Sequence, residues 1–136
     1  MHEGGCLFGS VRYRTRSEPR RGLVCRCTLC QPSDRRPFLR EAAFLREDVE
    51  ITGGPIGTCE DRPGETGRAL RPRFCNRCGT ILGRTAEWSS EVRTRLGGTF
   101  DRPHRFEIDE PTFARSAARW MTFPPDAEVH KRHFLC

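Results

Sequence analysis

The chain has 136 residues, of which 35% are hydrophobic and 31% are charged, and its net charge is +6. This length fits one domain with a modest core, so we expect a single domain over residues 1–136. No apolar run approaches the roughly 18 residues that cross a membrane, and no signal peptide is visible at the N-terminus. We therefore expect no membrane partner and a cytoplasmic protein whose eight cysteines serve mainly to bind metal rather than to form disulfides, with the terminal Cys136 a free thiol.

The positive charge is carried almost entirely by arginine, and Lys131 is the only lysine. The arginines are spread from Arg12 to Arg132, with acidic residues such as Glu41 between them. A basic balance suits a nucleic-acid partner or an acidic substrate. Because the charge is dispersed, a genome whose codon usage favours arginine explains it better, and a nucleic-acid partner is not expected.

The N-terminal segment reads as a turn that leads into a strand. Val11 and Tyr13 alternate with arginines, which is the pattern of a half-buried strand. Cys6 and Phe8 are two positions apart, so on an extended backbone both side chains would face the same side. A cysteine at position 8 would complete a C-x-C metal half-site, but phenylalanine binds no metal.

Three thiols lie within six residues at Cys25, Cys27 and Cys30. The C-x-x-C spacing of the last two lets a turn direct both sulfurs at one metal ion, and Cys25 points to the same side if its backbone is extended. Three thiolates are one short of a closed tetrahedral zinc site. Structural zinc sites have four protein ligands, whereas catalytic sites keep one position open, and the spacing alone leaves both possibilities.

The middle of the chain alternates loops with strands. Two prolines within residues 31–37 predict a loop. Residues 38–51 favour strands over a short helix, because they end in Val49-Glu50-Ile51 before glycines and a proline. Residues 53–73 are rich in glycine, proline and charge, and they predict a long surface loop or hairpin that contains Cys59.

The most specific local signal is Cys75-x-x-Cys78-Gly79. Glycine after the second cysteine permits a left-handed turn in which amide groups point at the sulfurs. Strands are expected at residues 80–82, 92–96 and 106–108, and a helical turn within 113–121. The four histidines have no motif spacing with the cysteines, so we predict that each lies at the surface. Taken together, the elements predict a mainly β fold.

The cysteines can be combined in two ways. One plan gathers four of them into a single structural zinc site. The other closes a structural site around Cys6, Cys75 and Cys78 and leaves the 25/27/30 trio as a separate three-coordinate zinc. Spacing does not choose between these plans.

At this point the residues resemble a known family. The similar segments are Gly4-Gly5-Cys6-Leu7 with Gly9 and Val11-Arg12-Tyr13, Cys25-x-Cys27-x-x-Cys30, Phe74-Cys75-x-x-Cys78-Gly79, and Gly98-Thr99-Phe100-Asp101-x-Pro103. In this order they resemble the glutathione-dependent formaldehyde-activating enzymes, whose domain is shared with the centromere protein V group. The resemblance spans most of the chain.

The resemblance implies a compact, mainly β fold built around zinc. It implies structural zinc ligands at Cys6, Cys75 and Cys78, and a second, catalytic zinc at Cys25, Cys27 and Cys30. The family joins glutathione and formaldehyde into S-hydroxymethylglutathione, which is formally a carbon–sulfur lyase reaction in reverse. Zinc as cofactor and glutathione, or a similar small thiol, as co-substrate are therefore expected.

The chain departs from the family pattern at Phe8, where the family has the second cysteine of its N-terminal C-x-C. The structural site is then one thiolate short, and Cys59 is the leading candidate for the missing ligand. A water, a histidine or an empty position are the other possibilities. Arg26 also stands where the trio commonly has a histidine.

Two other functional classes are open to this sequence. A non-catalytic zinc module that binds a protein or nucleic acid predicts a fully coordinated zinc and salt-sensitive nucleic-acid binding. A thiol redox protein that uses Cys27 and Cys30 as a disulfide pair predicts a chain that folds without metal and cycles with reductant.

Overall fold

The computed structural model describes residues 1–26, 38–62, 67–103, 105, 110–112, 114–123, 125–126 and 128–130. The strands in these ranges are β1 (His2–Gly5), β2 (Val11–Thr15), β3 (Arg21–Cys25), β4 (Leu39–Leu45), β5 (Val49–Gly53), β6 (Ile56–Thr58), β7 (Leu70–Cys75), β8 (Ile81–Ala86), β9 (Val92–Leu96) and β10 (Glu110–Thr112). Short 3-10 helices span Arg46–Asp48, Gly97–Thr99 and Ala114–Ser116. The predicted mainly β class is confirmed.

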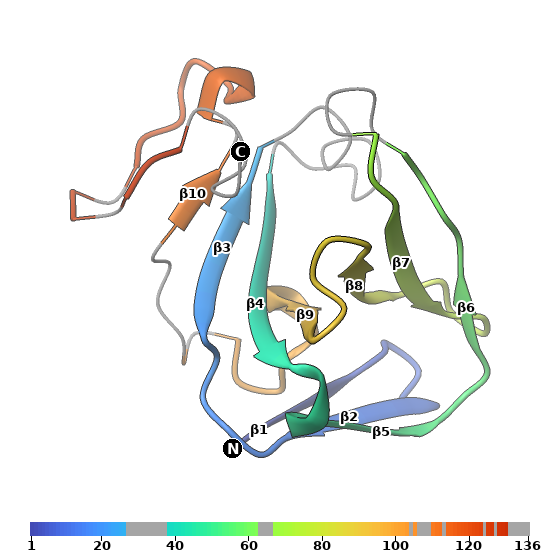
Figure 1. Cartoon of the computed structure of the whole chain (residues 1–136). Helices are drawn as coiled ribbons and strands as arrows, with labels where there is room; N and C mark the ends of the chain where they lie inside the picture. The colour runs from blue at the N-terminus through green and yellow to red at the C-terminus, as the bar shows by residue number, and fades with distance from the viewer. Residues whose placement is uncertain are drawn as a thin grey trace.

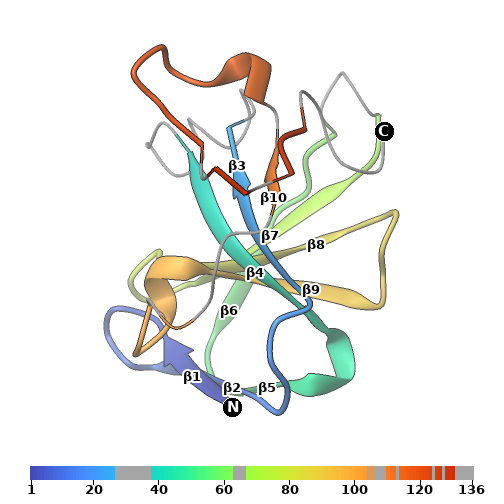
Figure 2. The same ribbon diagram turned by 90° about the vertical axis from the view of Figure 1, so that its left-hand side faces the viewer.

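The strands form three small sheets, with the orders β1-β2-β5, β10-β3-β4-β9 and β6-β7-β8. The pairing is antiparallel except between β10 and β3, which run parallel. In Figure 1, β3 and β4 stand on one side, β6 and β7 on the other, and the β1-β2-β5 sheet closes the bottom. β9 lies beside β4 in the second sheet, and β8 lies against β9 (Figure 2). The C-terminal end of β3 and that of β7 lie at opposite ends of the fold (Figure 1).

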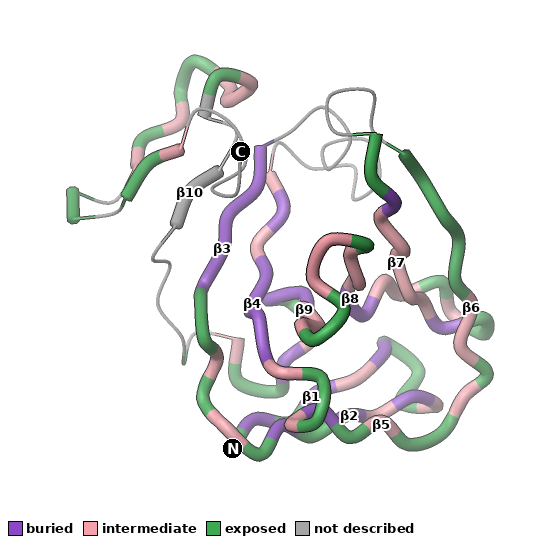
Figure 3. The backbone as a smooth tube through the Cα atoms, viewed as in Figure 1, coloured by how far each residue is buried: buried purple, intermediate pink, exposed green. Residues whose placement is uncertain are grey.

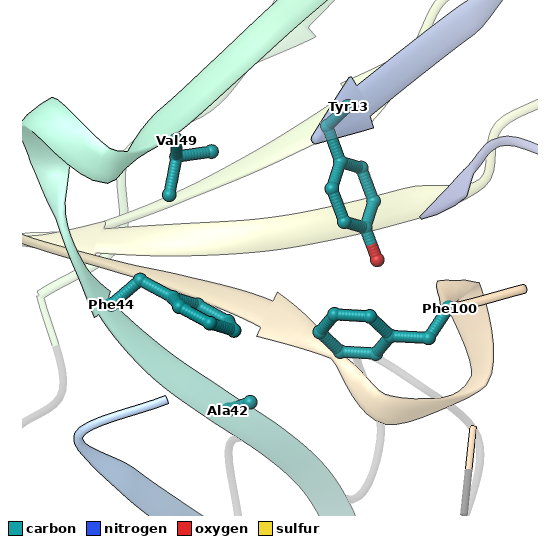
Figure 4. Packing of buried hydrophobic residues seen from close by; sticks show 5 residues of the cluster. All are labelled: Tyr13, Ala42, Phe44, Val49 and Phe100. Atoms are coloured by element: carbon teal, nitrogen blue, oxygen red, sulfur yellow. The ribbon is translucent and has the colours of Figure 1, made fainter. Parts of the chain in front are cut away.

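Buried aromatic side chains hold the β2, β4 and β5 strands together. Tyr13, Phe44 and Phe100 pack with Ala42 and Val49 in one cluster (Figure 4). The rings of Tyr13 and Phe100 meet edge to face, with centroids 5.5 Å apart at 87°, which is a favoured aromatic geometry. Tyr13 Oη lies 2.8 Å from Thr99 Oγ1, so the buried hydroxyl keeps a hydrogen-bond partner. The predicted alternation of Val11 and Tyr13 inward with arginines outward is confirmed.

His2 is buried, so the prediction of a surface residue is wrong for this histidine. Its exposed fraction is 6%, and its ring lies against Phe44 and Phe100 with centroids 6.3 and 5.9 Å away. Its Nε2 is 2.7 Å from Glu18 Oε2, so the ring combines an apolar contact with a polar partner. The reason is β1, a strand that the sequence did not predict and that turns alternate side chains inward.

The strands expected within residues 38–51 and 92–96 are confirmed by β4, β5 and β9, and the strand expected at 80–82 by β8. Residues 53–73 contain β6 and the start of β7, which pair antiparallel, so the hairpin alternative holds there. The predicted loop at 31–37 and the predicted strand at 106–108 lie outside the described residues. The helices of the described residues are too short and too polar for any of them to span a membrane.

A buried ion pair ties β4 to β8. Arg84 Nη2 donates to Glu41 Oε1 at 2.6 Å, and its Nε donates to Oε2 at 3.2 Å. The side chains are 12% and 5% exposed. Removing one partner of a buried ion pair is costly because the remaining charge stays desolvated.

We expect Glu41→Gln to lower the free energy of unfolding by about 3 kcal/mol, measured by urea denaturation. Glu60→Gln is the matched control, because Glu60 pairs with Arg71 at 3.0 Å on the surface, with side chains 44% and 42% exposed. That change should cost less than about 1 kcal/mol. Equal effects of the two substitutions would show that burial does not set the strength of the Glu41 pair.

Candidate metal centre

Three cysteines from distant parts of the chain converge on one point. The Sγ atoms of Cys6, Cys75 and Cys78 all lie within 4.8 Å of one another. Cys6 follows β1, Cys75 is the last residue of β7, and Cys78 lies in the turn before β8. These are the three cysteines that the family resemblance, rather than the spacing, assigned to one site.

The C-x-x-C-G segment forms the turn that its sequence predicts. Gly79 has φ +74°, in the left-handed region that glycine adopts most easily. Its N–H donates to the Cys75 carbonyl oxygen at 2.8 Å, and the Cys75 N–H donates to the Thr80 carbonyl oxygen at 2.9 Å. These two bonds close the turn and bring the two sulfurs to the same side.

Polar groups surround the sulfurs. The Val11 N–H donates to Cys6 Sγ at 3.4 Å, and Ser10 Oγ lies 3.5 Å from Cys6 Sγ and 3.3 Å from Cys75 Sγ. Thr80 Oγ1 lies 3.1 Å from Cys78 Sγ. The hydrogen bond with Ser10 lowers the pKa of Cys6 to about 6. Burial acts in the opposite direction, and the hydrogen bond from the Val11 N–H lowers the pKa further. The pKa of Cys78 is also lowered, mainly by the Thr80 hydroxyl.

This environment suits a thiophilic metal ion. Thiolates are the ligand form of cysteine, and a lowered pKa means that less free energy is spent on deprotonation when a metal binds. Cys6 and Cys75 are 7% and 0% exposed, and they pack with Val11 and Leu82 in an apolar cluster. A close set of sulfur donors, two of them buried and Cys78 partly exposed, matches the ligand preference of structural zinc.

Phe8 and Cys59 do not contribute to this group. Residues 7–10 form a turn rather than a strand, so the alternation of an extended backbone does not apply to Cys6 and Phe8, and the Phe8 side chain is 69% exposed. Cys59 follows β6, is exposed, and is not among the thiols that converge. Its N–H donates to the Pro72 carbonyl oxygen at 3.4 Å as part of the β6–β7 pairing.

The three-cysteine segment begins at the other end of the fold. Cys25 is the last residue of β3, is 6% exposed, and packs with Leu39 and Leu96. It does not belong to the Cys6/Cys75/Cys78 group. Cys25 therefore lies at a different place in the fold from those three cysteines. Cys27 and Cys30 lie outside the described residues. Figure 3 shows that β3 and β4, which flank this end, are largely buried.

Arg26 is held beside Cys25 in an apolar setting. The side chain is 5% exposed, its Cζ lies 4.6 Å from the centroid of the Phe123 ring, and its Nε lies 3.1 Å from Met121 Sδ. Burial lowers the pKa of Arg26 from its ordinary value. The segment 121–123 therefore packs against the first residues of the three-cysteine segment.

Two hydroxyl residues next to the sulfurs were missed by sequence reasoning. Ser10 lies four positions after Cys6, and Thr80 lies two positions after Cys78. Closeness in sequence was their only signal, and serine and threonine near cysteine are too common to single out. Their role depends on side-chain direction, which the fold sets.

The fold and the cluster define the class of protein: a small, mainly β protein whose cysteines converge on a site that could hold a metal ion. The sequence profile of the family described as glutathione-dependent formaldehyde-activating enzyme matches residues 1–116. The chain therefore belongs to the glutathione-dependent formaldehyde-activating enzyme family.

Among solved structures, the chain is similar to a Rhodobacter sphaeroides protein whose crystal structure was a Northeast Structural Genomics target. The TM-score is 0.60 with 15% sequence identity, and the match covers 80% of this chain and 97% of that chain. At this identity the likeness concerns the fold alone. No curated protein matches the chain.

Proposed function

We propose that this protein is a zinc-dependent enzyme of the carbon–sulfur lyase type, acting on a glutathione adduct such as S-hydroxymethylglutathione. The observation that carries this proposal is the family match over residues 1–116, which includes both cysteine segments and Cys6. In this proposal Cys25, Cys27 and Cys30 hold the catalytic zinc. Cys6, Cys75 and Cys78 hold a second zinc that stabilises one domain spanning residues 1–136.

The reaction joins or separates a thiol and an aldehyde. In the direction of synthesis the thiol sulfur bonds to the carbonyl carbon of formaldehyde, and the thiol proton ends on the carbonyl oxygen; the lyase direction reverses both changes. Zinc held by thiolates with one open position polarises a carbonyl oxygen or stabilises a thiolate. The chain's part is to place Cys25 at the end of a strand whose last four residues are buried, which keeps this sulfur away from bulk water.

Charge and compartment are consistent with this substrate. Glutathione carries two carboxylates, and arginine binds carboxylates through two parallel hydrogen bonds. The chain carries 24 basic residues, of which only Lys131 is not an arginine. A cytoplasmic location would keep the cysteines reduced, as metal binding requires.

The test is the zinc content of anaerobically purified protein, with and without glutathione. We expect two zinc ions per chain in the wild type and one in Cys27→Ser. In the wild type, glutathione should perturb the zinc ion that Cys27→Ser lacks. Cys59→Ser is the matched control because Cys59 is exposed and outside the thiol cluster, and it should keep both ions. The rate of exchange between formaldehyde and glutathione can be followed by NMR. It should fall to the uncatalysed rate in Cys27→Ser but not in Cys59→Ser.

Other outcomes point to the other classes. One zinc per chain that is indifferent to glutathione and to Cys27→Ser would favour a non-catalytic zinc module for protein or nucleic-acid binding. Salt-sensitive binding to nucleic acid would then identify its partner. A chain that folds without metal and cycles between thiol and disulfide at Cys27 and Cys30 would favour the redox alternative.

A further inference from the structure

The thiol cluster has three sulfur donors, whereas a closed structural zinc site takes four ligands. Cys59, the leading candidate from sequence, lies outside the group, and Phe8, which stands where the family has a cysteine, is exposed and carries no donor. The remaining position needs a donor from the immediate surroundings of the sulfurs.

We propose that the Ser10 hydroxyl is the fourth donor of the metal ion held by Cys6, Cys75 and Cys78. Ser10 Oγ lies 3.3 Å from Cys75 Sγ and 3.5 Å from Cys6 Sγ, so it faces two of the three sulfurs at once. In the described part of the chain, these two sulfurs are its hydrogen-bond partners. A hydroxyl oxygen has two lone pairs, so it can donate to a thiolate in the metal-free protein and accept a metal ion in the loaded one.

The distances agree with this role. Zinc–sulfur bonds of about 2.3 Å and zinc–oxygen bonds of about 2.0–2.2 Å give a tetrahedron whose sulfur–oxygen edges are about 3.5–3.7 Å long. The two edges from Ser10 Oγ are 3.3 and 3.5 Å. The hydroxyl oxygen is therefore within about 0.2 Å of the tetrahedral spacing from two of the three sulfurs.

Thr80 is the competing hydroxyl, and its contacts favour it less. Its Oγ1 lies 3.1 Å from Cys78 Sγ and also accepts the N–H of Leu7 at 3.1 Å. The structure gives it contact with one sulfur rather than two. Thr80 thus acts as a hydrogen-bond partner of Cys78 and an anchor for the turn at residue 7.

The backbone fixes Ser10 in place. Its carbonyl oxygen accepts the Gly54 N–H at 3.0 Å, just before β2 pairs with β5. A Cβ at Gly53 would lie only 2.1 Å from that carbonyl oxygen, and Gly53 has φ +78°, so this close approach requires glycine. The following residue, Val11, is fully buried. Ser10 therefore lies in the turn directly before β2, with its carbonyl oxygen bonded to the residue after β5 and its hydroxyl beside the sulfurs.

A neutral hydroxyl is a weaker donor than a thiolate. Three thiolates and one hydroxyl leave less negative charge on the site than four thiolates do, so the ion should leave more readily than from a four-cysteine site. This inference rests on metal binding at the cluster and not on the proposed lyase reaction. Its test needs neither glutathione nor formaldehyde.

The experiment compares Ser10→Ala, Ser10→Cys and Thr80→Ala, each in a Cys27→Ser background so that the signal comes from the thiol cluster. The rate of zinc transfer to a chromophoric chelator measures retention. The visible absorption of the cobalt-substituted protein measures how many thiolates surround the ion, because ligand softness and geometry set these bands. Both readouts are independent of catalysis.

We expect Ser10→Ala to release zinc at least about tenfold faster and to change the cobalt spectrum. Ser10→Cys should release zinc at least about tenfold more slowly and show a four-thiolate spectrum, whereas Thr80→Ala should keep the parent's spectrum. Three results would overturn the proposal: an unchanged spectrum in Ser10→Ala, a Ser10→Cys variant that gains no thiolate ligand, or a loss of ligand caused by Thr80→Ala instead.

Discussion

Replacing Cys75 by serine is expected to remove the metal ion from the thiol cluster and to destabilise the whole fold. Cys75 is fully buried and joins the cluster to the apolar contacts of Val11 and Leu82. A ligand that binds only the native state, at a free concentration 1,000 times its dissociation constant, adds about 4 kcal/mol to stability. We expect Cys75→Ser to lose about this much free energy of unfolding, which lowers the melting temperature by on the order of 10 °C.

The measurement is thermal unfolding with and without a strong zinc chelator. The chelator should destabilise the wild type and have little further effect on Cys75→Ser, because the variant has no ion in this site to lose. Cys59→Ser is the control, since it removes an exposed thiol outside the group, and it should unfold like the wild type. If the wild type unfolds at the same temperature with and without chelator, the metal ion of the cluster does not stabilise the fold.

Phe44→Ala is expected to cost about 3–5 kcal/mol of stability, the usual cost of truncating a buried aromatic ring. Phe44 is fully buried in β4, and its ring contacts those of His2 and Phe100 at centroid distances of 6.3 and 6.1 Å. Figure 4 shows it between Val49 and Ala42, so neighbours on several strands would face the cavity. Guanidinium denaturation followed by tryptophan fluorescence measures the loss.

Phe8→Ala provides the matched control for Phe44→Ala. The same atoms are removed, but Phe8 is 69% exposed in the turn after Cys6. We expect its free energy of unfolding to change by no more than about 0.5 kcal/mol. If both substitutions cost the same, the aromatic cluster would not be the main core of the β2, β4 and β5 strands.

If the protein holds the two metal ions of the proposed function, the loss of each ion should have a different consequence. The Cys6/Cys75/Cys78 cluster joins the β1–β2 turn to the β7–β8 turn, so loss of its ion should act on stability. Cys25 ends β3 at the opposite end of the fold, and in the proposed function loss of its ion acts on the reaction. A stability measurement and an exchange assay on the same variants therefore separate the two roles.

The sequence by itself determined the elements whose signals are local. The C-x-x-C-G turn, the left-handed Gly79 and the alternation of Val11 and Tyr13 depend on a few neighbouring residues, and the structure has each of them. Three ordered cysteine segments also sufficed for the resemblance to the family, because the spacing of metal ligands along the chain is a local and specific signal.

Only the tertiary structure decided how distant residues meet. The alternation of side chains placed Phe8 beside Cys6 on an extended chain, but a turn at 7–10 points Phe8 outward and brings Ser10 to the sulfurs instead. The Glu41–Arg84 pair and the burial of His2 likewise depend on how sheets pack against one another. The physical reason is the distance along the chain over which each effect acts. Backbone geometry fixes the directions of neighbouring side chains over two or three residues. The partners of a side chain depend instead on how the whole chain buries its apolar surface.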